Sequence, residues 1–134
     1  MNLLKTLTIT LLIISAPVVA ASPSRLVTHN TTNVRSNTYF AGYIPSSAPA
    51  QAHDDGLLDW PFVKMACYGH TSATKCPAVI KVAIDTPNPV DLGKVTIDIE
   101  TGDITPKSLS LNGYTLVVNG PGEMTLTKKR SPFD

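Results

Sequence analysis

Apolar and polar residues alternate with a period of two through most of the chain after Trp60. Successive side chains of a strand point to opposite faces of its sheet, so this period is typical of strands that bury one face. The longest run is 76–84, and its apolar face consists of Cys76, Ala78, Ile80, Val82 and Ile84. The alternation therefore predicts an all-β fold for this part of the chain.

The first 21 residues are typical of a secretory signal peptide that is cleaved after Ala20 or Ala21. One cation, Lys5, precedes an apolar run over residues 7–14, and small residues follow. This run is shorter than the ~20 apolar residues that a transmembrane helix needs. We therefore expect an exported protein without a transmembrane anchor, in the periplasm or in the extracellular space.

The charge balance argues against one class of partner. Cleavage removes Lys5 from the eleven basic residues, which leaves ten basic and ten acidic residues in the mature chain. A chain without excess positive charge is poorly suited to bind nucleic acid by neutralising its phosphates. We therefore expect no nucleic-acid partner.

Two cysteines, Cys67 and Cys76, are present, and an exported chain enters an oxidising compartment. Residues 61–68 share the period-two pattern and place Cys67 on their apolar face. If they pair with 76–84 in a hairpin closed between the cysteines, both apolar faces lie on the same side of the sheet. We therefore predict one disulfide within this hairpin, worth about 2.5–3 kcal/mol in the chain-entropy model.

Two turn signals set the register of the last strands. Asn112-Gly113 is the strongest short hairpin signal, because both residues tolerate positive φ. Together with Gly120-Pro121-Gly122, it places Leu116 opposite both Leu109 and Leu126. The turn spacing predicts about six or seven strands in a small antiparallel β-sandwich, with a small β-barrel as the alternative.

Residues 22–56 are rich in Ser, Thr, Asn, Ala and Pro and show weak periodicity. This composition favours a flexible or loosely packed N-terminal arm, followed by a β domain over 57–129 and a C-terminal tail over 130–134. A helix of one or two turns fits the pattern only over His53–Trp60. The proline-rich segment 85–93 is expected to carry the chain from one sheet to another.

Three groups of titratable residues offer reactive side chains, but none forms the full pattern of a known site: Asp98 and Glu100 have the carboxylate spacing of a glycosidase but lie on a strand face without a cleft. His53-Asp54-Asp55 with Asp59 supplies metal-ligand types without EF-hand spacing. Asp98 and Glu100 share one strand face, and His70 needs an acid such as Asp98 to act on a nucleophile. No Gly-x-Ser-x-Gly motif is present. We therefore assign no catalytic residue, no metal and no cofactor.

Aromatic side chains and the loop between the cysteines supply the candidate binding residues. Trp60 and Phe62 are expected to close one end of the core. A disulfide-closed polar loop is constrained, which lowers the ordering cost of binding. The candidate binding residues are Tyr39, Phe40, Tyr43, Trp60, Tyr68 and His70. The candidate contacts to anionic lipid head groups are Lys128, Lys129 and Arg130.

These features predict a small exported binding or interaction protein without enzymatic activity, built on a disulfide-pinned β domain. Its partner is a protein, a glycan or a lipid head group, and the sequence does not choose among them. Two alternatives stay open. One is a small secreted hydrolase that uses His70 with an acid such as Asp98, and the other is a structural or assembly subunit of an envelope or extracellular polymer.

Overall fold

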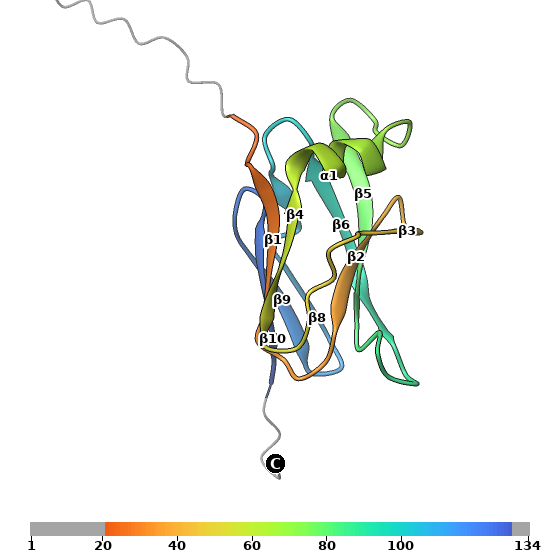
Figure 1. The fold of residues 1–134 in the computed structure, drawn as a ribbon, viewed down its shortest axis with the longest axis vertical. Helices are drawn as coiled ribbons and strands as arrows, with labels where there is room; N and C mark the ends of the chain where they lie inside the picture. Colours follow the sequence, from red (N-terminus) through yellow and green to blue (C-terminus); the bar gives the residue numbers. More distant parts are fainter. Residues whose placement is uncertain (1–20, 130–134) are drawn as a thin grey trace, which may run out of the picture.

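Ten strands and one short helix make up the regular structure of residues 21–129, which are the residues that the computed structural model describes (Figure 1). The predicted signal peptide, apart from Ala21, and the predicted tail 130–134 lie outside these residues. In chain order the elements are β1 (Arg25–Asn30), β2 (Ser36–Phe40), β3 (Ile44–Pro45), β4 (Asp54–Asp59), α1 (Trp60–Cys67), β5 (Lys75–Val82), β6 (Val90–Asp98), β7 (Ile104–Thr105), β8 (Ser108–Leu111), β9 (Tyr114–Gly120) and β10 (Glu123–Lys128).

The strands form two five-stranded sheets that pack face to face (Figure 1). The first sheet has the order β4-β1-β10-β9-β8, and the second has the order β3-β2-β5-β6-β7. Neighbouring strands are antiparallel except for β1 and β10, which run parallel. Because neither sheet closes on itself, the predicted β-sandwich is confirmed and the barrel alternative is wrong.

The core lies between the sheets, where the inward-facing apolar residues meet. The predicted inward face of β5 is confirmed, since Cys76, Ala78, Ile80 and Val82 are all almost fully buried. Such alternation buries the apolar side chains on one face of the sheet and leaves the polar side chains of the other face in solvent.

The predicted turn registers are also confirmed. Asn112 and Gly113 both adopt positive φ, as the hairpin signal predicts. Leu116 of β9 lies opposite Leu109 of β8 and Leu126 of β10.

Residues 60–67 form helix α1, so the predicted strand over 61–68 is wrong. The helix buries Trp60, Val63 and Cys67, a spacing of three and four residues that matches the helical period. Pro61 lies in the first turn, where its missing N–H removes no hydrogen bond. In so short a segment the same apolar residues fit a period of two or of 3.6, and packing across the ends of both sheets selects the helix.

The predicted disulfide is confirmed, but it does not lie within a hairpin. Cys67 and Cys76 are bonded, with their Cα atoms 5.8 Å apart. The bond joins the last residue of α1 to the second residue of β5. It therefore fixes the helix to the second sheet rather than two strands to each other.

The segment 22–56 is not a loosely packed arm, because it forms β1 to β3 and the start of β4. Its polar side chains satisfy buried backbone groups, so low hydrophobicity here does not imply exposure. The Asn30 amide, for example, donates to the carbonyl oxygens of Val34 and Ala50. The helix considered over His53–Trp60 is strand β4 for most of its length. The buried polar residues of this segment are Asn30, Thr32, Ser36, Asn37, Thr38 and Ser46.

The segment 85–93 does not cross between sheets, contrary to the prediction. It joins β5 to β6, which are antiparallel neighbours in the second sheet. The prolines limit pairing only up to residue 89, and β6 begins at Val90. The chain crosses to the first sheet later, between β7 and β8.

Candidate functional site

An apolar groove of about 230 Å³ opens beside α1. The end of β2, the short strand β3, the residues after it, β4 and one side of α1 all contribute to it. Its lining residues are Phe40, Ile44, Pro45, Ser46, Ser47, Leu58, Phe62, Met65 and Ala66. The groove therefore joins segments that are separated in the sequence and meet only in the folded chain.

The orientation of α1 turns apolar side chains toward solvent at this groove. Because Trp60, Val63 and Cys67 occupy the buried side of the helix, Phe62 and Met65 point away from the core. Their exposed fractions are 51% and 69%. The Trp60 indole N–H donates to the Ile99 carbonyl oxygen over 2.9 Å, which together with the disulfide holds the helix in this orientation.

The floor of the groove is part of the core. Phe40 is fully buried and Leu58 nearly so. A rigid apolar floor with partly exposed walls is typical of a binding site that forms before its ligand arrives.

Two loops meet at the outer edge of this region. The Tyr43 hydroxyl and His70 Nε2 are hydrogen-bonded at 3.3 Å, and the two rings pack edge to face with centroids 5.7 Å apart. Tyr43 belongs to the β2–β3 turn, and His70 belongs to the loop between the cysteines. The His70 backbone N–H donates to the Cys67 carbonyl oxygen, so the disulfide end of α1 positions the histidine.

The structure brings together some of the predicted binding residues and separates others. Tyr43 and His70 are in contact, and Tyr68 is two residues from His70 in the same loop. Phe40 and Trp60 are buried in the core. Tyr39 lies elsewhere on the second sheet, where the Lys81 ammonium is 4.7 Å from its ring centroid.

Phe62 and Met65 were not among the predicted binding residues. A strand over 61–68 would place Met65 on the same inward face as Cys67, two residues further on, and Phe62 is predicted to help close the core. A helical period starting at Trp60, with proline in the first turn, is the signal that identifies both as outward-facing.

The hydrolase alternative required His70 to act with an acid such as Asp98. The Asp98 carboxylate instead accepts hydrogen bonds from the backbone N–H groups of Glu100 and Thr101 and from the Thr74 hydroxyl. Burial alone would raise the pKa of Asp98, but these hydrogen bonds and the nearby Lys75 ammonium lower it below its usual value. Among residues 21–129, no hydrogen bond joins His70 to Asp98.

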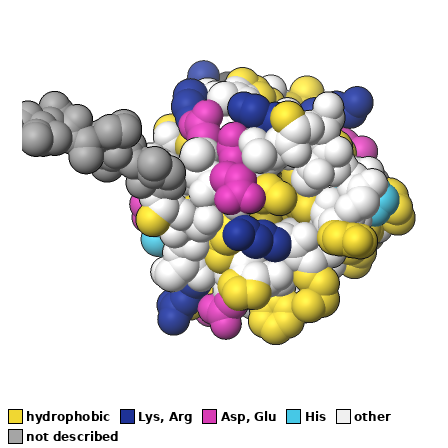
Figure 2. Space-filling view, turned by 90° about the horizontal axis from the view of Figure 1, so that it is seen from above, with side chains coloured by type: hydrophobic (Ala, Val, Ile, Leu, Met, Phe, Trp, Pro, Cys, Tyr) yellow, Lys and Arg dark blue, Asp and Glu magenta, His cyan; other side chains and the backbone are white. Residues whose placement is uncertain are grey.

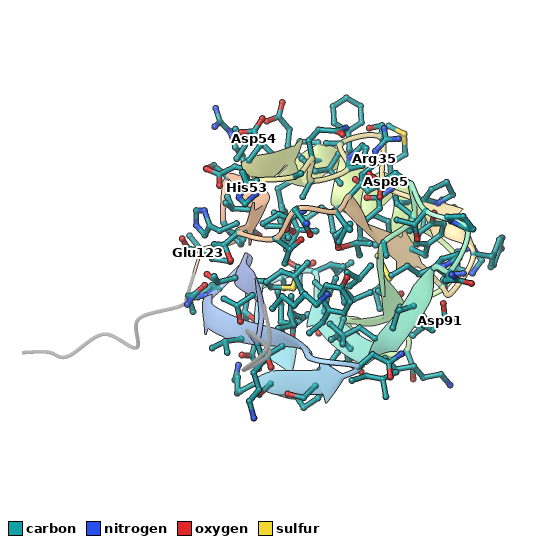
Figure 3. The ribbon with its side chains drawn as sticks, turned by 90° about the horizontal axis from the view of Figure 1, so that it is seen from below. Arg35, His53, Asp54, Asp85, Asp91 and Glu123 are labelled. Atoms are coloured by element: carbon teal, nitrogen blue, oxygen red, sulfur yellow. A yellow bond between two sulfur atoms is a disulfide. The ribbon has the colours of Figure 1, made fainter. Side chains whose placement is uncertain are left out.

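Asp55, which the sequence groups with His53 as a candidate metal ligand, is hydrogen-bonded to a different histidine, His29. Asp55 Oδ1 lies 2.8 Å from His29 Nδ1, and Glu123 Oε2 lies 2.6 Å from His29 Nε2. Figure 3 shows His53 and Asp54 on the side of the molecule that also carries Glu123. Within the described part of the chain, no three side chains of His, Cys, Asp or Glu are grouped so that they could hold a metal ion.

Strand β10, which carries the predicted lipid contact Lys128 as its last residue, ends far from α1 along the molecule (Figure 1). The Lys128 ammonium is 5.2 Å from the centroid of the Tyr114 ring, and the Lys129 backbone N–H donates to the Gly113 carbonyl oxygen. Arg130 lies outside the described residues. In residues 21–129, no helix is long and apolar enough to cross a membrane.

The chain resembles known proteins over most of its length. Residues 1–129 match the family described as "T2SS substrate NttC". A crystal structure of the Legionella pneumophila type II secretion system substrate NttC is 53% identical to this chain, with a TM-score of 0.77. The similarity covers 81% of this chain and 100% of that one. No curated protein sequence matches the chain. The chain therefore belongs to the family of the type II secretion system substrate NttC and is an exported protein.

Proposed function

We propose that this protein is secreted into the extracellular space and acts there as a binding protein without enzymatic activity. Its ligand is an uncharged apolar group, which enters the groove beside α1. Membership of a family of secretion substrates supports the extracellular location. The predicted signal peptide, whose cleavage comes after Ala20 or Ala21, supports the first step of export.

The observation that carries the binding proposal is the groove itself. Phe40 and Leu58 form a buried floor, while Phe62 and Met65 leave much of their surface in water at its wall. Apolar surface that stays exposed in this way marks a contact site, because covering it releases water.

The size and lining of the groove define the group that it can take. Its volume of about 230 Å³ is below the roughly 300–1,000 Å³ of pockets for drug-sized molecules. No charged residue lines it, and the polar lining consists of Ser46 and Ser47. A single apolar side chain or the end of an acyl chain fits this description, whereas a charged substrate would lose its hydration without gaining a partner.

The hydrolase alternative has less support from the geometry. The acid proposed for it, Asp98, already accepts hydrogen bonds from two donors in the turn after β6 and from Thr74 in the loop between the cysteines. His70 is hydrogen-bonded to Tyr43, a group that does not orient a general base as a carboxylate does. Both residues therefore have structural partners instead of each other.

The proposal is tested by titrating the ¹⁵N-labelled mature protein with N-acetyl-phenylalaninamide, using N-acetyl-glycinamide as the control. We expect the aromatic amide to shift backbone resonances of Ile44, Phe62 and Met65, because its ring enters the groove. Met65→Ser should weaken these shifts. Leu111→Ser, at a similarly exposed apolar residue of β8, should leave them unchanged.

Two results would contradict the proposal. If both amides produced the same weak and scattered shifts, the groove would not be a binding site. If the groove resonances shifted with protein concentration alone, the alternative of an assembly subunit would gain support, because the groove would then bind another copy.

A further inference from the structure

Several large apolar side chains extend into solvent around the groove. They come from the β2–β3 turn, from α1 and from the loop after α1, and they are Tyr43, Phe62, Met65 and Tyr68. Tyr43 is 65% exposed and Tyr68 is 86% exposed. Figure 2 looks onto this end of the molecule and shows hydrophobic side chains gathered along one side of it, with a histidine beside them. We call these four residues, together with Lys64, the α1 surface.

The two chain segments that build the α1 surface contain no acidic residue. Residues 39–52 carry no Asp, Glu, Lys or Arg, and residues 60–75 carry only Lys64 and Lys75. All ten acids of the chain lie outside these segments. Lys75 is paired with Asp98 over 3.6 Å, whereas Lys64 takes part in none of the salt bridges among residues 21–129. The α1 surface is thus apolar with one free positive charge, in a mature chain that is neutral as a whole.

We infer that the α1 surface docks on a phospholipid membrane that carries anionic head groups. Phe62 and Met65 would enter the boundary between head groups and acyl chains, and the groove would take the end of one acyl chain. The Tyr43 and Tyr68 rings, each with an apolar body and a hydroxyl, suit the head-group level. Lys64 supplies the attraction to anionic lipid. The inference rests on the proposed function, because it uses the same groove.

The position of the α1 surface permits this contact. Helix α1 lies at one end of the long axis of the molecule (Figure 1). Figure 2 also shows acidic side chains near the middle of this end, so the approach is tilted toward the hydrophobic side, which brings the turn, the helix and the loop to the membrane together. The disulfide holds α1 and the following loop in place, so little ordering cost accompanies docking. A glycan partner is less favoured, because Phe62 and Met65 offer it no hydrogen bond.

The inference is tested by sedimenting the mature protein with vesicles of phosphatidylcholine, alone or mixed with phosphatidylglycerol. We expect binding to the mixed vesicles, weaker binding to phosphatidylcholine alone, and a loss of the difference at high salt. Phe62→Ser combined with Met65→Ser should weaken binding to the mixed vesicles about tenfold or more. Lys64→Glu should weaken binding to the mixed vesicles only. Leu111→Ser, at an exposed residue of β8 away from the α1 surface, should bind as the wild type does.

A second measurement checks insertion directly. Trp60 is the only tryptophan and is buried, so Tyr68→Trp adds one exposed reporter to a constant background. We expect its emission to move to shorter wavelength on mixed vesicles and to be quenched by brominated lipid. The melting temperature of each variant, measured in solution, shows that these exposed residues are not needed for folding.

The inference is overturned if the wild type sediments with neither vesicle, if the Phe62 and Met65 variant binds like the wild type, or if the Tyr68→Trp emission does not change. The titration with N-acetyl-phenylalaninamide separates this failure from failure of the proposed function. If the groove binds the amide while no vesicle binds, the binding function stands and its partner is not a membrane.

Discussion

Two carboxylates hold the His29 side chain on the outer face of the first sheet. His29 lies on β1, between Asp55 on β4 and Glu123 on β10, so the three side chains connect three neighbouring strands. The hydrogen bonds to Glu123 and Asp55 raise the pKa of His29 above its ordinary value of 6.5. Protonation of one ring therefore couples the edge strand β4 to the interior of the sheet.

We expect His29→Gln to destabilise the protein more at about pH 6 than at about pH 9. The folded state binds the proton more tightly, so the stabilisation is complete below the unfolded pKa near 6.5 and is lost as the pH rises through the higher folded pKa. Solvent screens these partly exposed side chains, so the difference is about 1 kcal/mol or less. Thermal melts of variant and wild type across this range measure it.

His53→Gln is the matched control, because His53 is exposed and forms no salt bridge among the described residues. His53→Gln should change the melting temperature little, because no salt bridge among the described residues is lost. A His29→Gln effect that grows toward alkaline pH would show that the ring is held in its neutral form.

Helix α1 is the element that shapes the candidate site, and the disulfide is its main covalent support. Cys67 and Cys76 are both fully buried, and their bond joins the end of the helix to β5. If α1 shifted, Phe62 and Met65 would lose their place at the groove wall. Stability of the helix and shape of the groove are therefore coupled.

We expect replacement of both cysteines, Cys67→Ala with Cys76→Ala, to lower the free energy of unfolding by about 2–4 kcal/mol. The unfolded chain gains conformational entropy when the loop is opened, and each kcal/mol corresponds to about 4–8 °C in melting temperature. Calorimetry of the variant, and of the wild type with and without reductant, measures the change. Tyr68→Ser changes an exposed residue next to Cys67 and should have little effect on the melting temperature. An unchanged melting temperature in the double variant would contradict a structural role for the bond.

The order of the strands makes the N-terminal part of the chain essential to the whole molecule. Strand β1 pairs with β4 on one side and with β10 on the other. Its Leu26 is nearly fully buried. Without β1, the paired edges of both neighbours would lose their hydrogen-bond partners.

We expect deletion of residues 22–35 to abolish cooperative thermal unfolding, measured by circular dichroism. Leu26→Ala is the milder version and should destabilise the fold by about 2–5 kcal/mol, because it leaves a cavity between the sheets. If the deletion variant still melted in one sharp transition near the wild-type temperature, the segment would be an accessory arm after all.

The sequence by itself determined the β-sandwich, the registers around Asn112-Gly113 and 120–122, and the disulfide. These depend on local alternation, on residues that tolerate positive φ, and on two cysteines in an exported chain. Only the tertiary structure decided that residues 60–67 are helical. Trp60, Val63 and Cys67 fit the helical period, but Val63, Met65 and Cys67 fit a period of two equally well.

Tertiary structure also decided that residues 22–56 form strands of the sandwich, and it decided where the groove lies. The polar residues of that segment are buried because distant backbone groups accept their hydrogen bonds, as Ala50 does for Asn30. The groove needs β2, β3, β4 and α1 to meet at one end of the molecule. A local pattern carries no information about such meetings, because they result from packing between segments that are remote in the chain.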